Sequence, residues 1–321
     1  PGFGLEDDMF QNYDMHPEDM NFKVAVIPTK TFDAMLEKTA SFSPDENPGK
    51  TLKLVVKETN TNTIVGFIRY GSPLINSKPR NDFLGGIPDL DIFNKRAIMG
   101  FNIVPVQPFG YNCLGGKLLA AICCSHASRR MLNQKYDTEF CLFETTSLYG
   151  STTSASQYDG LKPFFRYKGL TESKFLPLLH DRVFHKLHDR FTLLNNNTPL
   201  TDNKASSKKM KRQTKMIASI KKSLKDENKL QQFNNVIEMA FGLTQKKRFY
   251  ISDYGYGNVR EVIRGDQDKL VHGQNWDKFH LDNIISWWKR KAGKRYEKLK
   301  KEGRFRTEVE LWTEDDNIQI I

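Results

Sequence analysis

Cysteine is scarce in this sequence, and the spacing of the cysteines argues against both a zinc-binding domain and a disulfide-rich domain. The chain has 321 residues but only four cysteines, Cys113, Cys123, Cys124 and Cys141. They form no C-x-x-C pair and have no histidine at the spacing typical of zinc sites, so neither a structural metal nor a disulfide framework is expected. Cys123 and Cys124 lie within an apolar run, which predicts buried, unreactive thiols in a reducing compartment.

Long hydrophobic runs are also missing. No stretch of about 18 apolar residues occurs, which argues against a transmembrane helix. The N-terminus lacks the basic and then apolar layout of a secretory signal. Hydrophobic residues make up 38% of the chain and the mean hydropathy is -0.58, values typical of a globular protein with a core. We therefore expect a cytoplasmic protein with no membrane partner.

Acidic residues are few in the last third of the sequence. The whole chain has a net charge of +11. Residues 201–321 contain 27 Lys and Arg against 17 Asp and Glu, whereas residues 1–200 contain 22 against 21. A basic excess confined to one part is typical of a protein that contacts a polyanion. The sequence thus predicts a nucleic-acid partner, DNA in preference to RNA. Lysine-rich helix faces that simply meet solvent are the alternative.

Strand-like and helix-like segments alternate through the first two thirds of the chain. Apolar runs bounded by turn residues predict strands, and apolar residues at three and four spacing predict helices. The expected strands are 22–28, 51–58, 64–73, 97–106 and 139–145, and the expected helices are 29–40, 115–134 and 173–194. This order predicts an α/β (α+β) fold over residues 23–195, with a mixed central sheet flanked by helices.

The regions on either side of this core have a different composition. Residues 1–22 are acidic and are expected to form an N-terminal arm. Residues 196–207 are rich in turn formers, which predicts a linker. Residues 208–321 are expected to be basic and mainly helical, with a hairpin at 247–265 and an amphipathic helix at 281–299.

Aromatic residues are interleaved with cations in this last region, a mixture that suits base stacking and phosphate contact. The expected nucleic-acid-binding residues are Lys211, Arg212, Lys215, Lys247, Arg248, Tyr254, Tyr256, Arg260, Lys289, Lys294, Arg295 and Lys298. A hairpin with packed tyrosines is the alternative for residues 247–265.

A strand, a glycine-containing loop and a helix start follow one another in residues 102–121. Such a junction offers backbone N–H groups and a partial positive charge to an anion. The candidate binding residues are Gln107, Gly110, Asn112, Gly115, Gly116 and Lys117. They resemble the Q/R-x-x-G-x-G/A loop of acyl-CoA N-acyltransferases of the GNAT type, although Asn112 stands where that motif has Gly or Ala. The resemblance implies a GNAT-like core and an acyl-CoA cofactor.

The strand that ends near Phe143 leads into a tract of Ser, Thr and Gly. Open α/β sheets bind ligands outside the carboxyl ends of their strands, so this tract predicts a substrate site. Glu144 is the candidate general base, and Tyr149 and Tyr158 are candidate acids. The alternative is an exposed polar loop with a solvated Glu144.

Three segments, 66–73, 102–122 and 142–171, resemble the domain family of unknown function typified by the Druantia anti-phage protein DruA. The likeness covers about residues 50–195 and implies a phage or defence setting, with a distant similarity to Mom-type DNA-modifying acyltransferases. Two functions therefore remain open. One is a phage-associated nucleic-acid-binding protein that modifies DNA by acyl transfer, and the other is a non-catalytic DNA- or RNA-binding module on an α/β scaffold.

Overall fold

The chain folds into two compact units, of which the smaller is inserted into the larger. The computed structural model describes residues 7–40, 49–74, 76–147, 156–172, 179, 181–200 and 208–311. The core unit comprises Pro1–Leu170 and Arg248–Ile321, and the helical unit comprises Thr171–Lys247. The expected boundary at 196–207 is therefore wrong, because residues 248–321 return to the core. Local sequence patterns do not reveal such a return.

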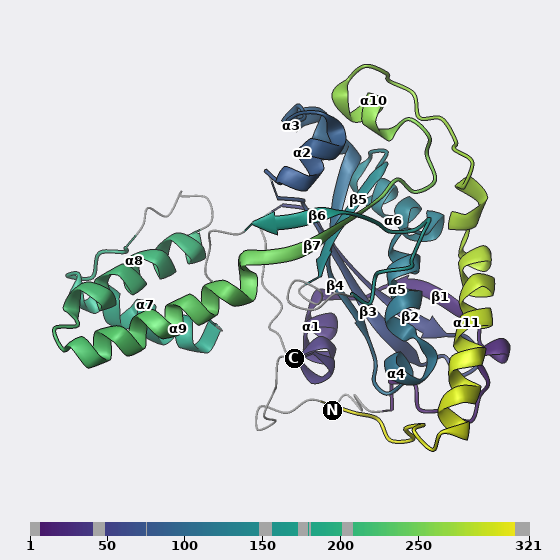
Figure 1. The fold of residues 1–321 in the computed structure, drawn as a ribbon, viewed down its shortest axis with the longest axis horizontal. Coiled ribbons are helices and arrows are strands. Elements are labelled where there is room, and N and C mark those ends of the chain that lie inside the picture. Colours follow the sequence, from purple (N-terminus) through teal and green to yellow (C-terminus); the bar gives the residue numbers. More distant parts are fainter. Residues whose placement is uncertain are drawn as a thin grey trace. The chain divides into compact units, whose positions relative to one another are not determined.

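The core unit is built on a seven-stranded mixed sheet (Figure 1). Its strands are β1 (Phe22–Val26), β2 (Thr51–Glu58), β3 (Ile64–Gly71), β4 (Ala97–Pro105), β5 (Leu142–Ser147), β6 (Arg166–Glu172) and β7 (Lys246–Ser252), in the spatial order β1-β2-β3-β4-β5-β7-β6. Strands β1 to β4 pair antiparallel, β4 and β5 pair parallel, and β5 and β7 pair antiparallel. The expected α/β class and the hairpin of β2 and β3 are confirmed.

Helices cover both faces of this sheet. On one side, α5 (Gly115–Cys123) lies against β3 and β4, and α11 (Leu281–Lys301) covers α5 and α4 (Phe109–Cys113); α1 (Thr29–Thr39) lies on the other side (Figure 1). Trp288 anchors α11, because its ring is fully buried and its Nε1–H donates to the carbonyl of Cys113 over 2.7 Å. The amphipathic helix expected near 281–299 is confirmed.

The helix expected over 115–134 is instead two helices. α5 ends at Cys123, and α6 (His126–Tyr136) starts after Ser125, whose hydroxyl accepts a hydrogen bond from the N–H of Ser128 at 3.1 Å. A serine in this position satisfies an N–H that the first helical turn leaves unpaired. The break therefore lies at a residue whose side chain caps the second helix.

Short helices close one end of the core unit. They are α2 (Lys78–Leu84), α3 (Leu90–Arg96) and α10 (Val259–Arg264), and α10 packs against both of the others. The second strand expected within 247–265 is wrong, because the chain turns at Tyr254 and Gly255, both with positive φ, and enters α10. Gly255 is required here, since a Cβ would lie 2.7 Å from the backbone of Trp276, next to the 3-10 turn Trp276–Phe279.

The described part of the N-terminal segment is not a free arm. Met9, Phe10, Tyr13 and Met20 are buried, and the 3-10 turn Pro17–Asp19 packs against α11. The Tyr296 hydroxyl of α11 donates to the carbonyl of Tyr13 at 3.2 Å. The acidic composition of residues 1–22 concealed the few large apolar residues that pack on the core here.

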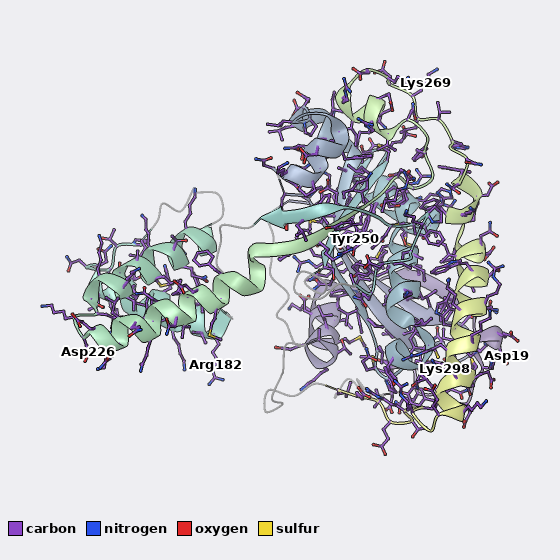
Figure 2. All side chains as sticks on the ribbon, viewed as in Figure 1. Asp19, Arg182, Asp226, Tyr250, Lys269 and Lys298 are labelled. Carbon is purple, nitrogen blue, oxygen red and sulfur yellow. The ribbon has the colours of Figure 1, made fainter. Side chains whose placement is uncertain are left out.

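The helical unit contains α7 (Asp181–Leu194), α8 (Lys208–Ser223) and α9 (Glu227–Gln245), of which α7 packs against α8. Among the residues of this unit that the structure describes, Phe184 and Met216 are buried apolar side chains. Asp226 lies at the turn between α8 and α9 (Figure 2). Part of the helix expected over 173–194 lies outside the described residues. Across the described part of the chain, no helix combines the length and apolar character needed to cross a bilayer.

Candidate functional site

The parallel strands β4 and β5 separate halfway along β4. Their paired register ends at Gly100 and Thr145, where the Thr145 hydroxyl donates to the Gly100 carbonyl over 2.9 Å. Phe101 is an extra residue in the β3–β4 ladder, and β4 then continues along β3 to Pro105. The backbone groups of Asn102–Pro105 that face away from β3 thus have no strand partner among the described residues. The carboxyl ends of parallel strands are where open α/β sheets take up ligands.

The N-terminus of α5 meets the segment that follows β5. A Cβ on Gly116 would lie 2.8 Å from Oε1 of Gln157, so glycine permits this close approach. Lys117 follows in the first turn of α5. Its pKa is lowered by burial and then by Lys291, whereas Asp159 acts in the opposite direction. The loop expected to bind a cofactor and the loop expected to bind a substrate are therefore neighbours.

Asp159 is the centre of a polar network at this point. Its Oδ1 accepts from Arg248 Nη2 at 3.0 Å and from the Tyr250 hydroxyl at 2.9 Å, and its Oδ2 accepts from the N–H of Ser156 at 2.9 Å. Burial alone would raise the pKa of Asp159, but the hydrogen bonds from Ser156, Tyr250 and Arg248 lower it below its usual value. Tyr250 lies on β7 in the core unit, as Figure 2 shows. The carboxylate is thus ionised and oriented at neutral pH.

The predicted base and acid are not brought together. Glu144 is 1% exposed and forms an ion pair of 3.2 Å with the equally buried Arg80 of α2. Burial raises the pKa of Glu144 to about 7, and Arg80 opposes this rise. Tyr158 is buried against the rings of Phe165 and Tyr250, at 5.1 Å and 5.5 Å.

These two side chains also lie on opposite faces of the sheet. Tyr250 is the β7 partner of Thr145, the neighbour of Glu144 on β5, and adjacent residues of a strand face opposite ways. The expectation that Glu144 and Tyr158 act together is therefore wrong. Burial raises the pKa of the Tyr158 hydroxyl far above its usual range, which fits a packing role. Tyr149 lies outside the described residues.

The six predicted cofactor residues divide into two groups. Gly115, Gly116 and Lys117 lie at the α5 N-terminus beside Gln157. Gln107, Gly110 and Asn112 lie in or next to α4 instead.

The C-terminal segment, residues 303–311, contacts Gln107 and Asn112 of this second group. Asn112 Nδ2 donates to the Arg306 carbonyl at 2.7 Å, and its Oδ1 accepts from the Arg306 N–H at 3.2 Å. The Gln107 carbonyl accepts from the N–H of Glu310 at 3.0 Å. These polar groups bind the chain itself. No local pattern signals this, because the partners are about two hundred residues apart in sequence.

Two of the predicted base-stacking residues are unavailable for stacking. Tyr254 is 0% exposed and Tyr256 is 7% exposed, so both rings belong to the core. The alternative of packed tyrosines is correct for these two positions. Arg248 is engaged by Asp159 and lies over the ring of Tyr167 at 4.0 Å, whereas Arg260 is exposed.

Three of the four predicted cations of α11 have contacts within the molecule. Lys289 donates to Asn21 at 3.3 Å, Arg295 lies over the ring of Tyr111 at 4.8 Å, and Lys298, visible in Figure 2, pairs with Glu302 at 3.7 Å. Lys294 is exposed. Residues 248–321 contain 15 Lys and Arg against 13 Asp and Glu. The expected basic excess is therefore not carried by this part of the chain.

The helical unit carries that excess. Residues 171–247 contain 16 Lys and Arg against 7 Asp and Glu, which is a net charge of +9 out of +11. The predicted residues Lys211 and Lys215 are exposed on α8, whereas Arg212 and Lys247 are half-buried, and burial lowers the pKa of Lys247. Further lysines that the list of candidates omitted are also exposed, namely Lys221, Lys222, Lys225 and Lys229.

Comparisons with family models, with curated proteins and with solved structures find no match for this chain. Its function is therefore inferred from the site itself.

Proposed function

We propose that this chain is a nucleic-acid-binding acyltransferase, with acyl-CoA as the donor and DNA as the preferred acceptor. The observation that carries the proposal is the separation of β4 and β5 beside the N-terminus of α5. Its neighbour, the Asp159 network, supplies the polar groups that a transfer reaction needs. The GNAT-type motif and the DruA-like likeness add a phage or defence setting in a bacterial cytoplasm.

The residues at this point suit an acyl-CoA in two respects. The edge of β4 at Asn102–Pro105, which has no strand partner in the part of the chain that the structure describes, offers backbone donors and acceptors to an extended chain that contains amides. The first turn of α5, with the Lys117 ammonium, suits a pyrophosphate. Acyl-CoA, when bound, supplies an acyl group activated as a thioester.

Asp159 replaces Glu144 as the candidate residue that orients the attacking amine. Its side chain is 35% exposed and is ionised, so it can accept a hydrogen bond from an amino group. Glu144 is sealed from solvent by its pairing with Arg80.

The charge of the helical unit supports contact with the acceptor. Exposed lysines on α8 and α9, with a net charge of +9 across residues 171–247, suit a phosphate backbone. Each neutralised phosphate adds about 0.9 to the slope of log affinity against log salt on duplex DNA. We expect a steep decrease of DNA affinity with salt, and a salt-independent affinity would contradict this part of the proposal.

Calorimetry with acetyl-CoA tests the donor site. We expect the parent protein to release heat on binding, and Gly116→Asp to bind at least tenfold more weakly, because its carboxylate would repel a pyrophosphate. Gly242→Asp makes the same chemical change on α9, where a Cβ meets no atom within 4 Å, and should bind like the parent. No heat from the parent would eliminate acyl-CoA as the cofactor.

Incubation of DNA with the protein and isotope-labelled acetyl-CoA tests transfer. We expect mass analysis of the nucleosides to show one labelled acetyl group, and Asp159→Asn to lose this product while it still binds acetyl-CoA. Product formation unchanged in Asp159→Asn would exclude the role given to this residue.

The non-catalytic alternative is favoured by one observation. Gln107 and Asn112 are bonded to the C-terminal segment, so half of the motif is engaged internally. Salt-dependent DNA binding together with no heat from acetyl-CoA would establish this alternative.

A further inference from the structure

Four cations gather at one end of the core unit, outside the candidate site. Arg166 and Lys168 come from β6, and Arg260 and Arg264 come from α10. The ring of Phe83 on α2 lies among them, 4.4 Å from the Lys168 ammonium and 5.6 Å from the Arg260 guanidinium. A Cβ on Gly85 would lie 3.7 Å from Arg264 and 3.8 Å from Arg260, so both side chains reach the end of α2.

Only half of this positive charge is compensated. Arg166 forms an ion pair with Asp253, and Arg264 pairs with Asp266 at 3.1 Å. Lys168 and Arg260 have no ion pair or hydrogen bond within the part of the chain that the structure describes.

The excess of positive charge affects the pKa of Lys168. Its pKa is lowered by burial, then by Arg166 and Arg260, while Asp253 acts in the opposite direction. Holding a half-buried ammonium beside a guanidinium is unfavourable unless an anion is present. The two charges are also restricted in position, because both lie near one aromatic ring.

The cluster lies on the other face of the sheet from the Asp159 network. Tyr167, between Arg166 and Lys168 on β6, lies 5.7 Å from the Tyr250 ring and beneath Arg248. Because successive side chains of a strand point to opposite faces, Arg166 and Lys168 face away from that network. An anion held here is therefore not the pyrophosphate of the proposed cofactor.

We propose that Lys168 and Arg260 bind a backbone phosphate of a nucleic acid. This inference rests on the nucleic-acid contact in the proposed function and adds a contact on the core unit to that of the helical unit. Arginine presents a planar fork of donors that matches phosphate oxygens, and lysine adds a point charge. The core unit has a net charge of only +2. Its attraction for a polyanion therefore depends on local clusters such as this one.

The test is duplex DNA binding over a range of salt concentrations, with Lys168→Gln and Arg260→Gln. Each variant should reduce the salt slope by about 0.9, so the loss of affinity between 50 and 200 mM salt shrinks roughly threefold. Lys23→Gln is the matched control, because Lys23 is exposed on β1 at the opposite edge of the sheet. Slopes equal to that of the control would overturn the inference.

A second measurement separates this inference from the proposed function. Inorganic phosphate, compared with chloride at equal ionic strength, should raise the Tm of the parent and of Lys23→Gln but not that of Arg260→Gln. If neutralising Lys221, Lys222 and Lys225 lowers the DNA salt slope and the two core variants do not, the core site is excluded and the proposed function stands. If phosphate stabilises the parent and DNA does not bind, both nucleic-acid assignments fail.

Discussion

At the scale of single residues, Arg80 and Glu144 form an ion pair that solvent does not reach. Arg80 also lies over the ring of Phe93 at 4.3 Å and donates to the Leu74 carbonyl at 2.8 Å. A buried pair of this kind gives little net stability, but removing one partner leaves an uncompensated charge. The pair therefore fixes how α2 and α3 sit on β5 rather than supplying catalysis.

Arg80→Met should destabilise the protein by about 3–5 kcal/mol at pH 8, because the buried Glu144 then either stays ionised without a partner or takes up a proton far above its unfolded pKa. Without Arg80, the folded-state pKa of Glu144 lies further above its usual 4.5 than the value of about 7 in the parent. Stability linked to this group is complete below the unfolded pKa and is lost as the pH rises. The variant should thus approach the parent at pH 5, as urea unfolding at both pH values will show.

Glu144→Gln in the Arg80→Met background is the control. An amide carries no charge, so the double variant should recover part of the loss at pH 8 and show little pH dependence. Equal instability of both variants at pH 5 and pH 8 would contradict the assigned protonation.

At the scale of elements, the C-terminal segment holds α4 through Asn112. Its side chain pairs with both the N–H and the carbonyl of Arg306, in the manner of a strand neighbour. The β-bridge between Gln107 and Glu310 continues this contact. Asn112 thus supplies two of the hydrogen bonds that attach this segment, beside the packing of Phe305 on Tyr296 and of Arg306 on Tyr111.

Asn112→Ala should leave both Arg306 backbone groups unpaired and cost about 1–3 kcal/mol. Hydrogen exchange in residues 303–311 should become faster while that of α1 stays the same. Asn235→Ala, an exposed change on α9, should alter neither region. Unchanged protection of residues 303–311 would show that other contacts hold this segment.

Elements that depend on local periodicity could be predicted from the sequence. α11 follows from apolar residues at three and four spacing, and β2 and β3 follow from two apolar runs joined by Asn and Thr. α10 was predicted as a strand, because its β-branched and apolar residues suit both states and the turn at Tyr254 packs inward. The pairing of β7 with β5 and the contacts of Asn112 could not be predicted, because they depend on partners that are distant in the sequence.

The candidate site was predictable only in part, for a similar reason. Gly116 and Lys117 were predicted from the motif, and the candidate acid Tyr158 is next to Asp159, which was not predicted. These two residues lie in a turn, and only their distant packing partners decide which of them is available. Tyr158 faces the packed rings, and Asp159 meets Arg248 from a strand ninety residues away.

At the scale of the whole molecule, the helical unit is an insertion between two neighbouring strands. β6 leads into it and β7 leads out, and the Thr171 hydroxyl donates to the Lys247 carbonyl at 3.3 Å where the strands begin and end. An insertion whose ends lie close together leaves the rest of a fold intact when it is removed.

Replacing residues 173–245 by a short Gly-Ser turn should therefore leave a cooperatively unfolding core unit, as circular dichroism on heating will show. The variant should lose most of the salt-dependent DNA affinity, because the excess of charge lies in the removed part. It should still bind acetyl-CoA, since Gly116 and Lys117 remain. Full DNA affinity in this variant would contradict the role given to the helical unit.

The packing of α11 on residues from early in the chain has a consequence for synthesis on the ribosome. Trp288 packs against Phe22 and Phe109, with ring centres 5.0 Å and 6.1 Å apart, and Tyr296 meets His16 at 5.0 Å. These early aromatic side chains also pack on one another, but the surface that α11 covers stays exposed until α11 leaves the exit tunnel. A nascent chain halted before Trp288 therefore exposes apolar surface, which favours aggregation and binding by chaperones.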